Sequence, residues 1–232
     1  MRGNADLCNS HFMKSLVFAS VTALLGLSSL MADVVLYDNG GPDQTTGDEM
    51  THLIQAEDFV LGIDAAIGRV NFWALDSNPS AYQGSIAWAI GADAGGSPGA
   101  ALAFGTATAT VTGTGNIVGI GAQSLVEDLV SFTIPKFSAI SGSHYWLELH
   151  NGPTTTNADL GFYWETSSSA PVNDVNTGQE ISLPGGDFWA DNGNEHAFQL
   201  IQVPEPSGLL LLVTLIGLAG LAKLRYKRTA RR

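Results

Sequence analysis

The chain has 232 residues, with 22 Asp and Glu against 10 Lys and Arg and a formal net charge of −12. Residues 33–202 hold 20 of these acids against only Arg69 and Lys136, a net charge of −18. Such a segment has no basic patch to neutralise phosphates, so the composition excludes nucleic acid as a partner and leaves cations or neutral molecules such as sugars. The single cysteine, Cys8, excludes an intramolecular disulfide.

The first 32 residues predict an export signal. Met13-Lys14-Ser15 gives a positively charged start, residues 16–31 are mainly apolar, and small residues surround a cleavage site after Ala32. This is the layout of a secretory signal peptide, which we expect to form a helix. Residues 1–12 fit no part of a signal, so we expect translation to start at Met13, which would leave Cys8 untranslated.

Residues 33–202 predict one extracytoplasmic all-β domain. Helical periodicity is weak and is confined to residues 124–129, whereas short alternating segments between Gly, Pro, Asn and Asp clusters recur. These features indicate an antiparallel β-sandwich. The predicted strands are residues 34–37, 54–60, 66–74, 84–90, 101–111, 129–134, 144–149, 161–164 and 195–203.

Alternation also predicts which side chains face the core. In residues 144–150, the core set is Tyr145, Leu147 and Leu149. Trp88 and Trp164 are likewise assigned to the core. Pro135 should end the preceding strand, because it cannot donate to the ladder. Residues 93–99 and 167–184 are predicted to be loops.

The opposite face of the same strand is a candidate ligand or metal face. His144, Trp146, Glu148 and His150 place two imidazoles and a carboxylate along one side. Most such faces are simply the solvated side of a sheet. Motifs of metalloproteases, serine hydrolases and P-loop enzymes are missing from the sequence. We therefore predict that the protein is not an enzyme and assign no catalytic residue.

Aromatic and acidic residues suggest two kinds of binding. Trp73, Trp146 and Trp189 could provide flat platforms on which pyranose rings stack, although aromatic rings also fill ordinary cores. Structural Ca²⁺ could bind loop oxygens, which it prefers. The calcium candidates are Asp38 and Asp43 in one Gly-rich loop and Asp191 and Glu195 in another. Such loops are also common turn formers.

The last 30 residues, 203–232, combine a proline-rich turn, an apolar run and a basic tail. The turn is Val203, Pro204, Glu205 and Pro206, and the uncharged run covers residues 208–222. We predict that this run is a transmembrane helix, although about 20 residues normally span a bilayer. The basic tail places the C-terminus in the cytoplasm and comprises Lys223, Arg225, Lys227, Arg228, Arg231 and Arg232. A plain single-span anchor or a buried helix followed by a solvated tail are the alternatives.

This order resembles the PEP-CTERM sorting signal of Gram-negative bacteria. The resemblance implies an exosortase-like processing enzyme as a partner, inner-membrane anchoring before processing, and a final location in the cell envelope, on the surface or in the extracellular matrix. The domain itself resembles secreted bacterial sandwiches through Leu36-Tyr37-Asp38-Asn39-Gly40-Gly41, Trp88-Ala89-Ile90 and Ala197-Phe198-Gln199-Leu200. That resemblance implies a jelly-roll-like or galactose-binding-like sandwich.

Together these features predict an exported, non-enzymatic structural or adhesive protein. The alternative is a carbohydrate-binding module for extracellular polysaccharide. A weaker alternative is a glycan-active hydrolase, for which no pair of carboxylates stands out.

Overall fold

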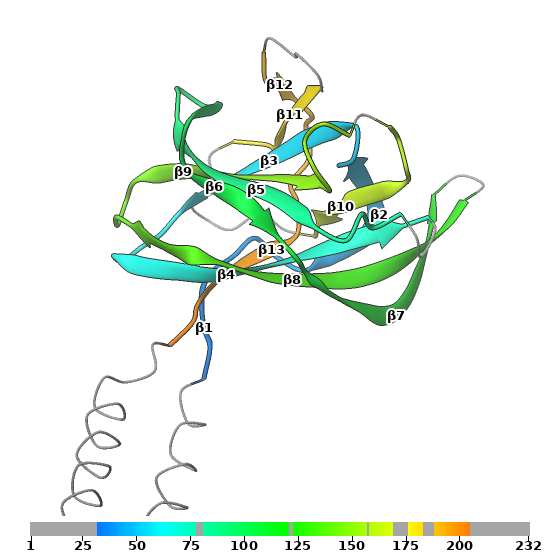
Figure 1. Ribbon diagram of the computed structural model, residues 1–232, viewed down its shortest axis with the longest axis horizontal. Coiled ribbons are helices and arrows are strands. Elements are labelled where there is room, and N and C mark those ends of the chain that lie inside the picture. The colour runs from blue at the N-terminus through cyan, green and yellow to red at the C-terminus, as the bar shows by residue number, and fades with distance from the viewer. Residues whose placement is uncertain are drawn as a thin grey trace, which may run out of the picture. The chain divides into compact units, whose positions relative to one another are not determined.

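The computed structural model describes residues 32–77, 81–120, 123–156, 158–168, 176–182 and 188–204. Within these ranges the secondary structure consists of strands and contains no helix, in agreement with the predicted all-β class. The strands form two antiparallel sheets that face each other (Figure 1). Residues Val34–Val203 form one compact unit. The predicted signal helix and transmembrane helix lie outside the described residues.

Sheet A is organised around its long central strand, β4. One edge of β4 pairs with β8. The other edge pairs with β13 over residues 69–72 and with β10 over residues 74–76. Outer pairs are β1 with β13, β2 with β10 and β7 with β8. The seven strands are β1 (Val34–Asp38), β2 (Pro42–Glu49), β4 (Ala65–Asp76), β7 (Thr110–Ile120), β8 (Gln123–Ala139), β10 (Phe162–Ser167) and β13 (Phe198–Gln202).

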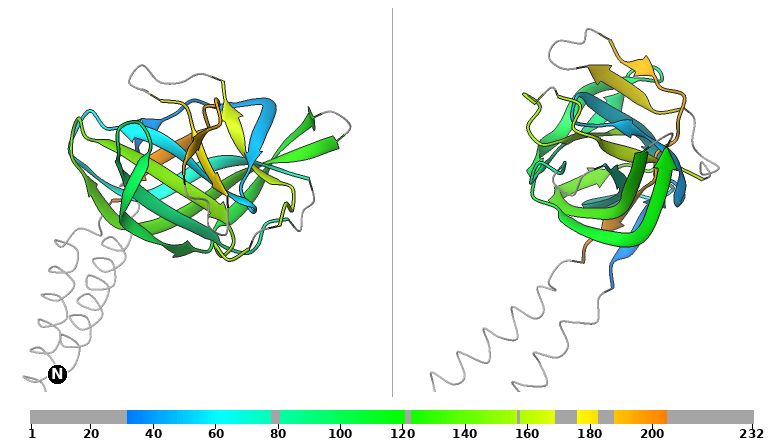
Figure 2. Two further views of the ribbon diagram at one scale, coloured as in Figure 1. Left: turned by 90° about the horizontal axis from the view of Figure 1, so that it is seen from above. Right: turned by 90° about the vertical axis from the view of Figure 1, so that its right-hand side faces the viewer.

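Sheet B has six strands in the order β12-β11-β3-β9-β5-β6. They are β3 (Leu53–Val60), β5 (Ile86–Asp93), β6 (Pro98–Ala107), β9 (His144–Asn151), β11 (Gln179–Ser182) and β12 (Ala190–Asp191). The left view of Figure 2 shows the paired end of β7 and start of β8 projecting beyond the rest of the sandwich. The short strands β11 and β12 extend sheet B at the side opposite β6.

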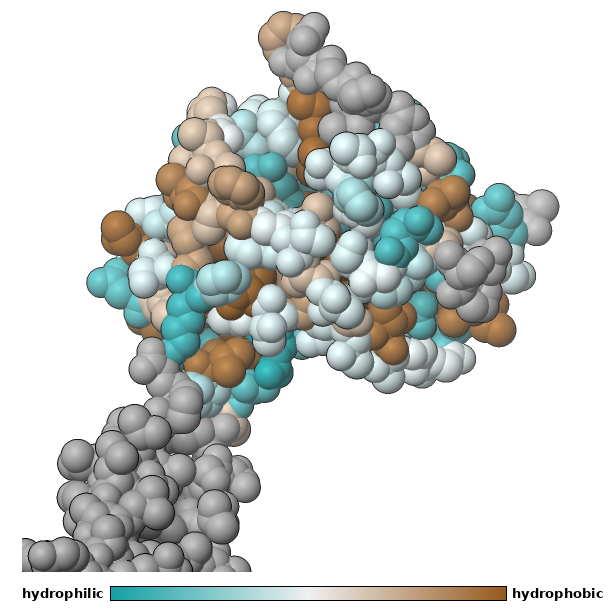
Figure 3. Space-filling model, in the orientation of Figure 1, coloured by the Kyte–Doolittle hydropathy of each residue, from teal (hydrophilic) through white to brown (hydrophobic). Residues whose placement is uncertain are grey.

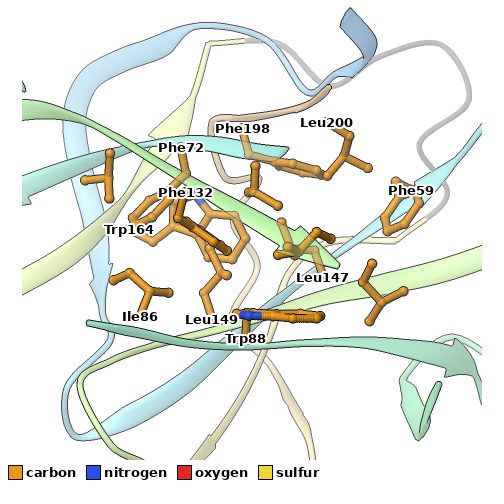
Figure 4. Close-up of a cluster of buried hydrophobic side chains, with 14 of the residues drawn as sticks. Phe59, Phe72, Ile86, Trp88, Phe132, Leu147, Leu149, Trp164, Phe198 and Leu200 are labelled. Carbon is orange, nitrogen blue, oxygen red and sulfur yellow. The ribbon is translucent and has the colours of Figure 1, made fainter. Parts of the chain in front are cut away.

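The core lies between the inward faces of the two sheets. In sheet A, Phe72 pairs with Val130 on one side and with Phe198 on the other. In sheet B, Leu147 lies opposite Ile90, and all five side chains are buried. Figure 4 shows rings and branched side chains from both sheets meeting in this layer. Each such side chain contributes roughly 1.5–3 kcal/mol through removal from water.

The predicted core assignments are confirmed. Trp88 and Trp164 are buried, and so are Tyr145, Leu147 and Leu149. The nine predicted strands all correspond to observed strands, but residues 101–111 divide into β6 and β7, which belong to different sheets. Strands β2, β11 and β12 were not predicted, because their polar sequences lack a regular apolar alternation. Residues 112–120, which form most of β7, were not predicted either.

The prediction that Pro135 ends a strand is wrong, because β8 continues to Ala139. The register of β8 against β4 shifts between Ile67 and Arg69, whose partners are Phe137 and Thr133. Pro135 therefore lies in a bulge, where the ladder does not require its missing N–H.

The tight turn that leads into β10 requires a glycine at residue 161. Gly161 has a φ of +78°, and a Cβ there would lie 1.9 Å from Ser77 Oγ. We predict that Gly161→Ala lowers the free energy of unfolding by about 1–3 kcal/mol more than Gly142→Ala. Gly142 is the matched control, because its φ is +73° but no atom lies within 4 Å of its Cβ position. Chemical denaturation measures both, and equal losses would contradict the steric explanation.

Candidate functional site

The predicted ligand face of β9 is much less exposed than expected. His144, Trp146, Glu148 and His150 point away from the core, but Trp146 is 0% exposed and His150 is 1% exposed. The ring nitrogens of His150 lie 3.0 Å from Gly152 O and 2.9 Å from Thr51 O. The expectation of a solvated face is therefore wrong for these two residues, because neighbouring segments cover them.

His144 is at the centre of a polar group on the outer face of sheet B. We name Asp58, Asp93, His144, Trp146 and Asn176 the His144 cluster. His144 Nε2 contacts Asp58 Oδ2, and its Nδ1 lies 3.5 Å from Asp93 Oδ1. Trp146 donates from Nε1 to Asp93 Oδ1 at 3.1 Å and stacks on the imidazole of His144. Asn176 donates to Asp58 from the segment before β11. The cluster thus joins β3, β9 and the β5–β6 turn.

Hydrogen bonds hold Asp93 as an anion. Burial alone would raise the pKa of Asp93, but donation from Trp146 and from the amides of Gly96 and Gly95, together with the charge of His144, lowers it below its ordinary value. The hydrogen bonds from Gly95 and Gly96 to Asp93 therefore stabilise the turn between β5 and β6.

Glu148 lies beside this cluster among small residues. It pairs with Ala56 and Ala89, and its Oε1 lies 2.7 Å from the position that a Cβ of Gly91 would occupy. Burial raises the pKa of Glu148 to about 7. The carboxyl group therefore exchanges its proton near neutral pH. Hydrolysis would also need a positioned nucleophile or base, and the adjacent His144 is held by Asp58 and Asp93.

A second polar group, which we name the His196 bridge, lies between the sheets. His196 is 0% exposed, and its Nδ1 lies 2.7 Å from Glu57 Oε2 while its Nε2 lies 2.9 Å from Asp48 Oδ2. Asp48 belongs to β2 of sheet A and Glu57 to β3 of sheet B, so the imidazole joins the two sheets. Its ring packs on Trp164 with centroids 4.7 Å apart.

Further hydrogen bonds complete this bridge. The backbone N of His196 donates to Glu57 at 2.9 Å, and Asn194 donates to Asp48 at 2.9 Å. Gly178 packs so closely that a Cβ there would lie 2.6 Å from His196 Cε1. With both ring nitrogens bound to carboxylates, His196 acts as a structural cation.

The charges of the bridge support this interpretation. Burial alone would lower the pKa of His196, but hydrogen bonds to Asp48 and Glu57 and their negative charges raise it to about 9. Burial alone would raise the pKa of Asp48, but His196 and Asn194 lower it below its ordinary value. The imidazolium is therefore the stable form at neutral pH.

Glu165 and Glu127 form a third acidic site, in sheet A. Glu165 is fully buried, and its Oε1 accepts from the backbone N of Gln44 at 3.0 Å. Gln44 is the only non-glycine residue with positive φ in the described ranges, at 59°. Burial and the charge of Glu127 raise the pKa of Glu165 to about 8, against the lowering effect of the Gln44 hydrogen bond. Glu165 is therefore largely neutral at pH 7.

The three tryptophans predicted as sugar platforms have different environments. Trp146 is excluded as a platform, because stacking requires an exposed ring face and this ring is 0% exposed and stacks on His144. Trp73, in β4, and Trp189, beside β12, are half-buried. Phe188, next to Trp189, is largely exposed. Of the three predicted platforms, Trp73 and Trp189 therefore retain accessible surface for a planar ligand.

The predicted calcium ligands act as turn caps. Asp38 accepts from Gly40 N and Gln199 Nε2, and Asp43 accepts from Thr45 N and Thr166 Oγ1. Asp191 accepts from Gly193 N. Glu195, the fourth predicted ligand, is the residue before His196 in the chain. Over the described ranges no three His, Cys, Asp or Glu side chains are arranged to hold a metal ion, so the calcium prediction gains no support.

The tail residues fall almost entirely outside the described residues. Val203 and Pro204 are included, whereas Glu205, Pro206, the apolar run and the six basic residues are not. Among the residues that are described, none forms a helix long and apolar enough to cross a membrane.

Sequence reasoning missed most of the buried polar residues. Glu57 alternates with Phe59 on the inward face of β3, so an acid in a core position was a detectable signal. His196, Asp48 and Asp58 carried no such signal. His196 meets Asp48, and Asp58 meets His144, only after strands that are distant in the chain come together.

The His196 bridge predicts a pH-dependent contribution to stability. The pKa of His196 is raised by folding from an ordinary 6.5 to about 9, so its stabilisation is complete below pH 6.5 and is lost as the pH rises through 9. We expect His196→Gln to cost about 3–5 kcal/mol at pH 6, because it leaves the buried Glu57 and the half-buried Asp48 without a cation. The difference from wild type should shrink between pH 7 and 10. A constant difference in denaturation experiments would contradict the bridge.

Comparisons with known proteins assign no family. No protein-family model matches the chain, and no curated protein matches it. The sites above are therefore interpreted from their contacts, burial and charge.

Proposed function

We propose that this protein is an exported, non-enzymatic structural or adhesive protein of a Gram-negative cell envelope or extracellular matrix. The observation that carries this proposal is the order of the C-terminal segments: Val203-Pro204-Glu205-Pro206, an uncharged run over residues 208–222, and a tail with six Lys and Arg. In this reading the run inserts into the inner membrane and an exosortase-like enzyme processes the tail. The N-terminal signal peptide provides export.

The arrangement of the domain's two ends supports this use. Val34 pairs with Gln202, so the first and last strands of the sandwich begin and end side by side. A domain whose ends are adjacent can follow a signal peptide and precede an anchor without rearrangement.

The engaged imidazoles support a non-enzymatic role. His144 contacts Asp58 and Asp93, His150 contacts two backbone carbonyls, and His196 contacts two carboxylates. A general base needs a nitrogen that can accept a proton from substrate. These contacts instead connect strands and turns.

We assign the sandwich to the jelly-roll-like class. The chain alternates repeatedly between the sheets, with β3 in sheet B, β4 in sheet A, β5 and β6 in sheet B, and β7 and β8 in sheet A. Such crossing of two antiparallel sheets is typical of double-sheet jelly rolls.

The intact mass of the protein from its native host tests the sorting proposal. We expect a mature chain that begins near residue 33 and ends between residues 204 and 207, recovered from the envelope or the medium. An unmodified C-terminus at Arg232 in the membrane fraction would contradict processing and indicate a plain single-span anchor.

Polysaccharide binding is the second candidate, favoured by the accessible Trp73 and Trp189. We expect retention of the protein on extracellular polysaccharide of the host, and loss of retention in Trp73→Ala or Trp189→Ala, because ring stacking is removed. Tyr82→Phe is a suitable control, since that ring packs on the core. Retention that survives both Ala changes would contradict a role for these rings.

A further inference from the structure

The edge strand β6 differs from the rest of this acidic domain because it carries no charge. Between Asp93 and Glu127 the sequence contains 33 residues without a single Asp, Glu, Lys, Arg or His. This segment includes the whole of β6 and β7, which are edge strands of sheets B and A. Edge strands are usually protected by charged side chains, proline or bulges, since their unpaired backbone groups attract other strands.

β6 also exposes apolar side chains. Phe104 is 77% exposed and Leu102 is 52% exposed, and both follow the free edge of sheet B. Figure 3 shows tan and brown residues gathered where β6 crosses the surface in Figure 1. Residues 103–107 pair with β5 in an unbroken register from Ile90 to Ile86, so this part of the edge is regular.

The remaining edges of the two sheets are poor templates for strand addition. β2 carries Asp43, Asp48 and Glu49, and β12 has two residues. The five residues of β1 include Asp38 and an irregularity between Val35 and Tyr37. The register of β7 is interrupted between Gly113 and Ile117, which leaves two regular stretches of four pairs each. The register of β6 also shifts, on both sides of Gly91, but residues 103–107 give five consecutive regular pairs. Among the edge strands that the structure describes, this is the longest regular and uncharged stretch.

We propose that β6 is a self-association edge, at which a second copy of this chain adds its own β6 in antiparallel orientation. The electrostatic argument identifies the occupant. Two copies with a net charge of −18 over residues 33–202 repel one another over most of their surfaces, and the neutral segment removes this repulsion locally. Identical strands related by a twofold axis are automatically self-complementary.

The regular stretch of β6, residues 103–107, sets the register between the two copies, because Gly105 is at its centre. A twofold axis at Gly105 places Phe104 opposite Thr106 of the second copy, and joins two copies of sheet B into one continuous sheet. Phe104 then packs across the new strand pair against Thr106 of the second copy. This inference goes beyond the proposed function and does not rest on it, because it concerns the domain and not the sorting tail.

Sedimentation velocity of the full chain in a non-ionic detergent tests the proposal over a range of protein concentrations. We expect a reversible dimer that strengthens when NaCl is raised from 0.05 to about 0.5 M, because salt screens the repulsion between acidic surfaces. Phe104→Lys should weaken the dimer at least about tenfold, since a solvated charge on the edge opposes strand pairing.

Ile117→Lys provides the matched control. Ile117 is 73% exposed on the other neutral edge, β7, and the variant keeps the same tail and net charge as Phe104→Lys. It should dimerise like wild type. Amide hydrogen exchange supplies a second measurement, with protection of residues 103–107 that increases with protein concentration. A wild-type monomer, undiminished association in Phe104→Lys, or equal loss in Ile117→Lys would each overturn the proposal.

Discussion

Burial of the apolar layer between sheets A and B is the interaction on which the rest of the structure depends. Residues 33–202 contain no cysteine, so no disulfide supplements this layer. The long strand β4 organises it, because β8, β13 and β10 all pair with β4 and take their register from it. Rings such as Phe72, Trp164 and Phe198 interlock edge to face at its centre (Figure 4). A domain of this size can be stable on such a core alone.

The buried charges are organised by the same packing. An acid buried between sheets is costly unless it is paired and hydrogen-bonded, and His196 provides both for Asp48 and Glu57. On the outer face of sheet B, the ring nitrogens of His144 contact Asp58 and Asp93. The imidazolium of His196 adds a positive charge to a segment whose only Lys and Arg are Arg69 and Lys136.

The surface follows a different principle from the core. Acidic residues are distributed over β2, the turns and the outer faces of the sheets. The uncharged segment that forms β6 and β7 interrupts this pattern at the sheet edges. The surface of the domain therefore combines a general acidic character with one uncharged segment at the sheet edges.

The sequence by itself determined the all-β class, the positions of most strands and the inward residues of β9, because alternation of apolar side chains is a local property of a half-buried strand. Trp88 and Trp164 were found in this way. Tertiary structure alone decided that residues 101–111 divide between two sheets, that Pro135 lies in a bulge, and that Trp146 and His150 are covered. It also decided the His196 bridge, since Asp48, Glu57 and His196 meet only through pairing of strands distant in the chain. Local patterns reveal which face of a strand is buried. Contacts between the sheets depend on which strands, distant in the chain, pair or face each other.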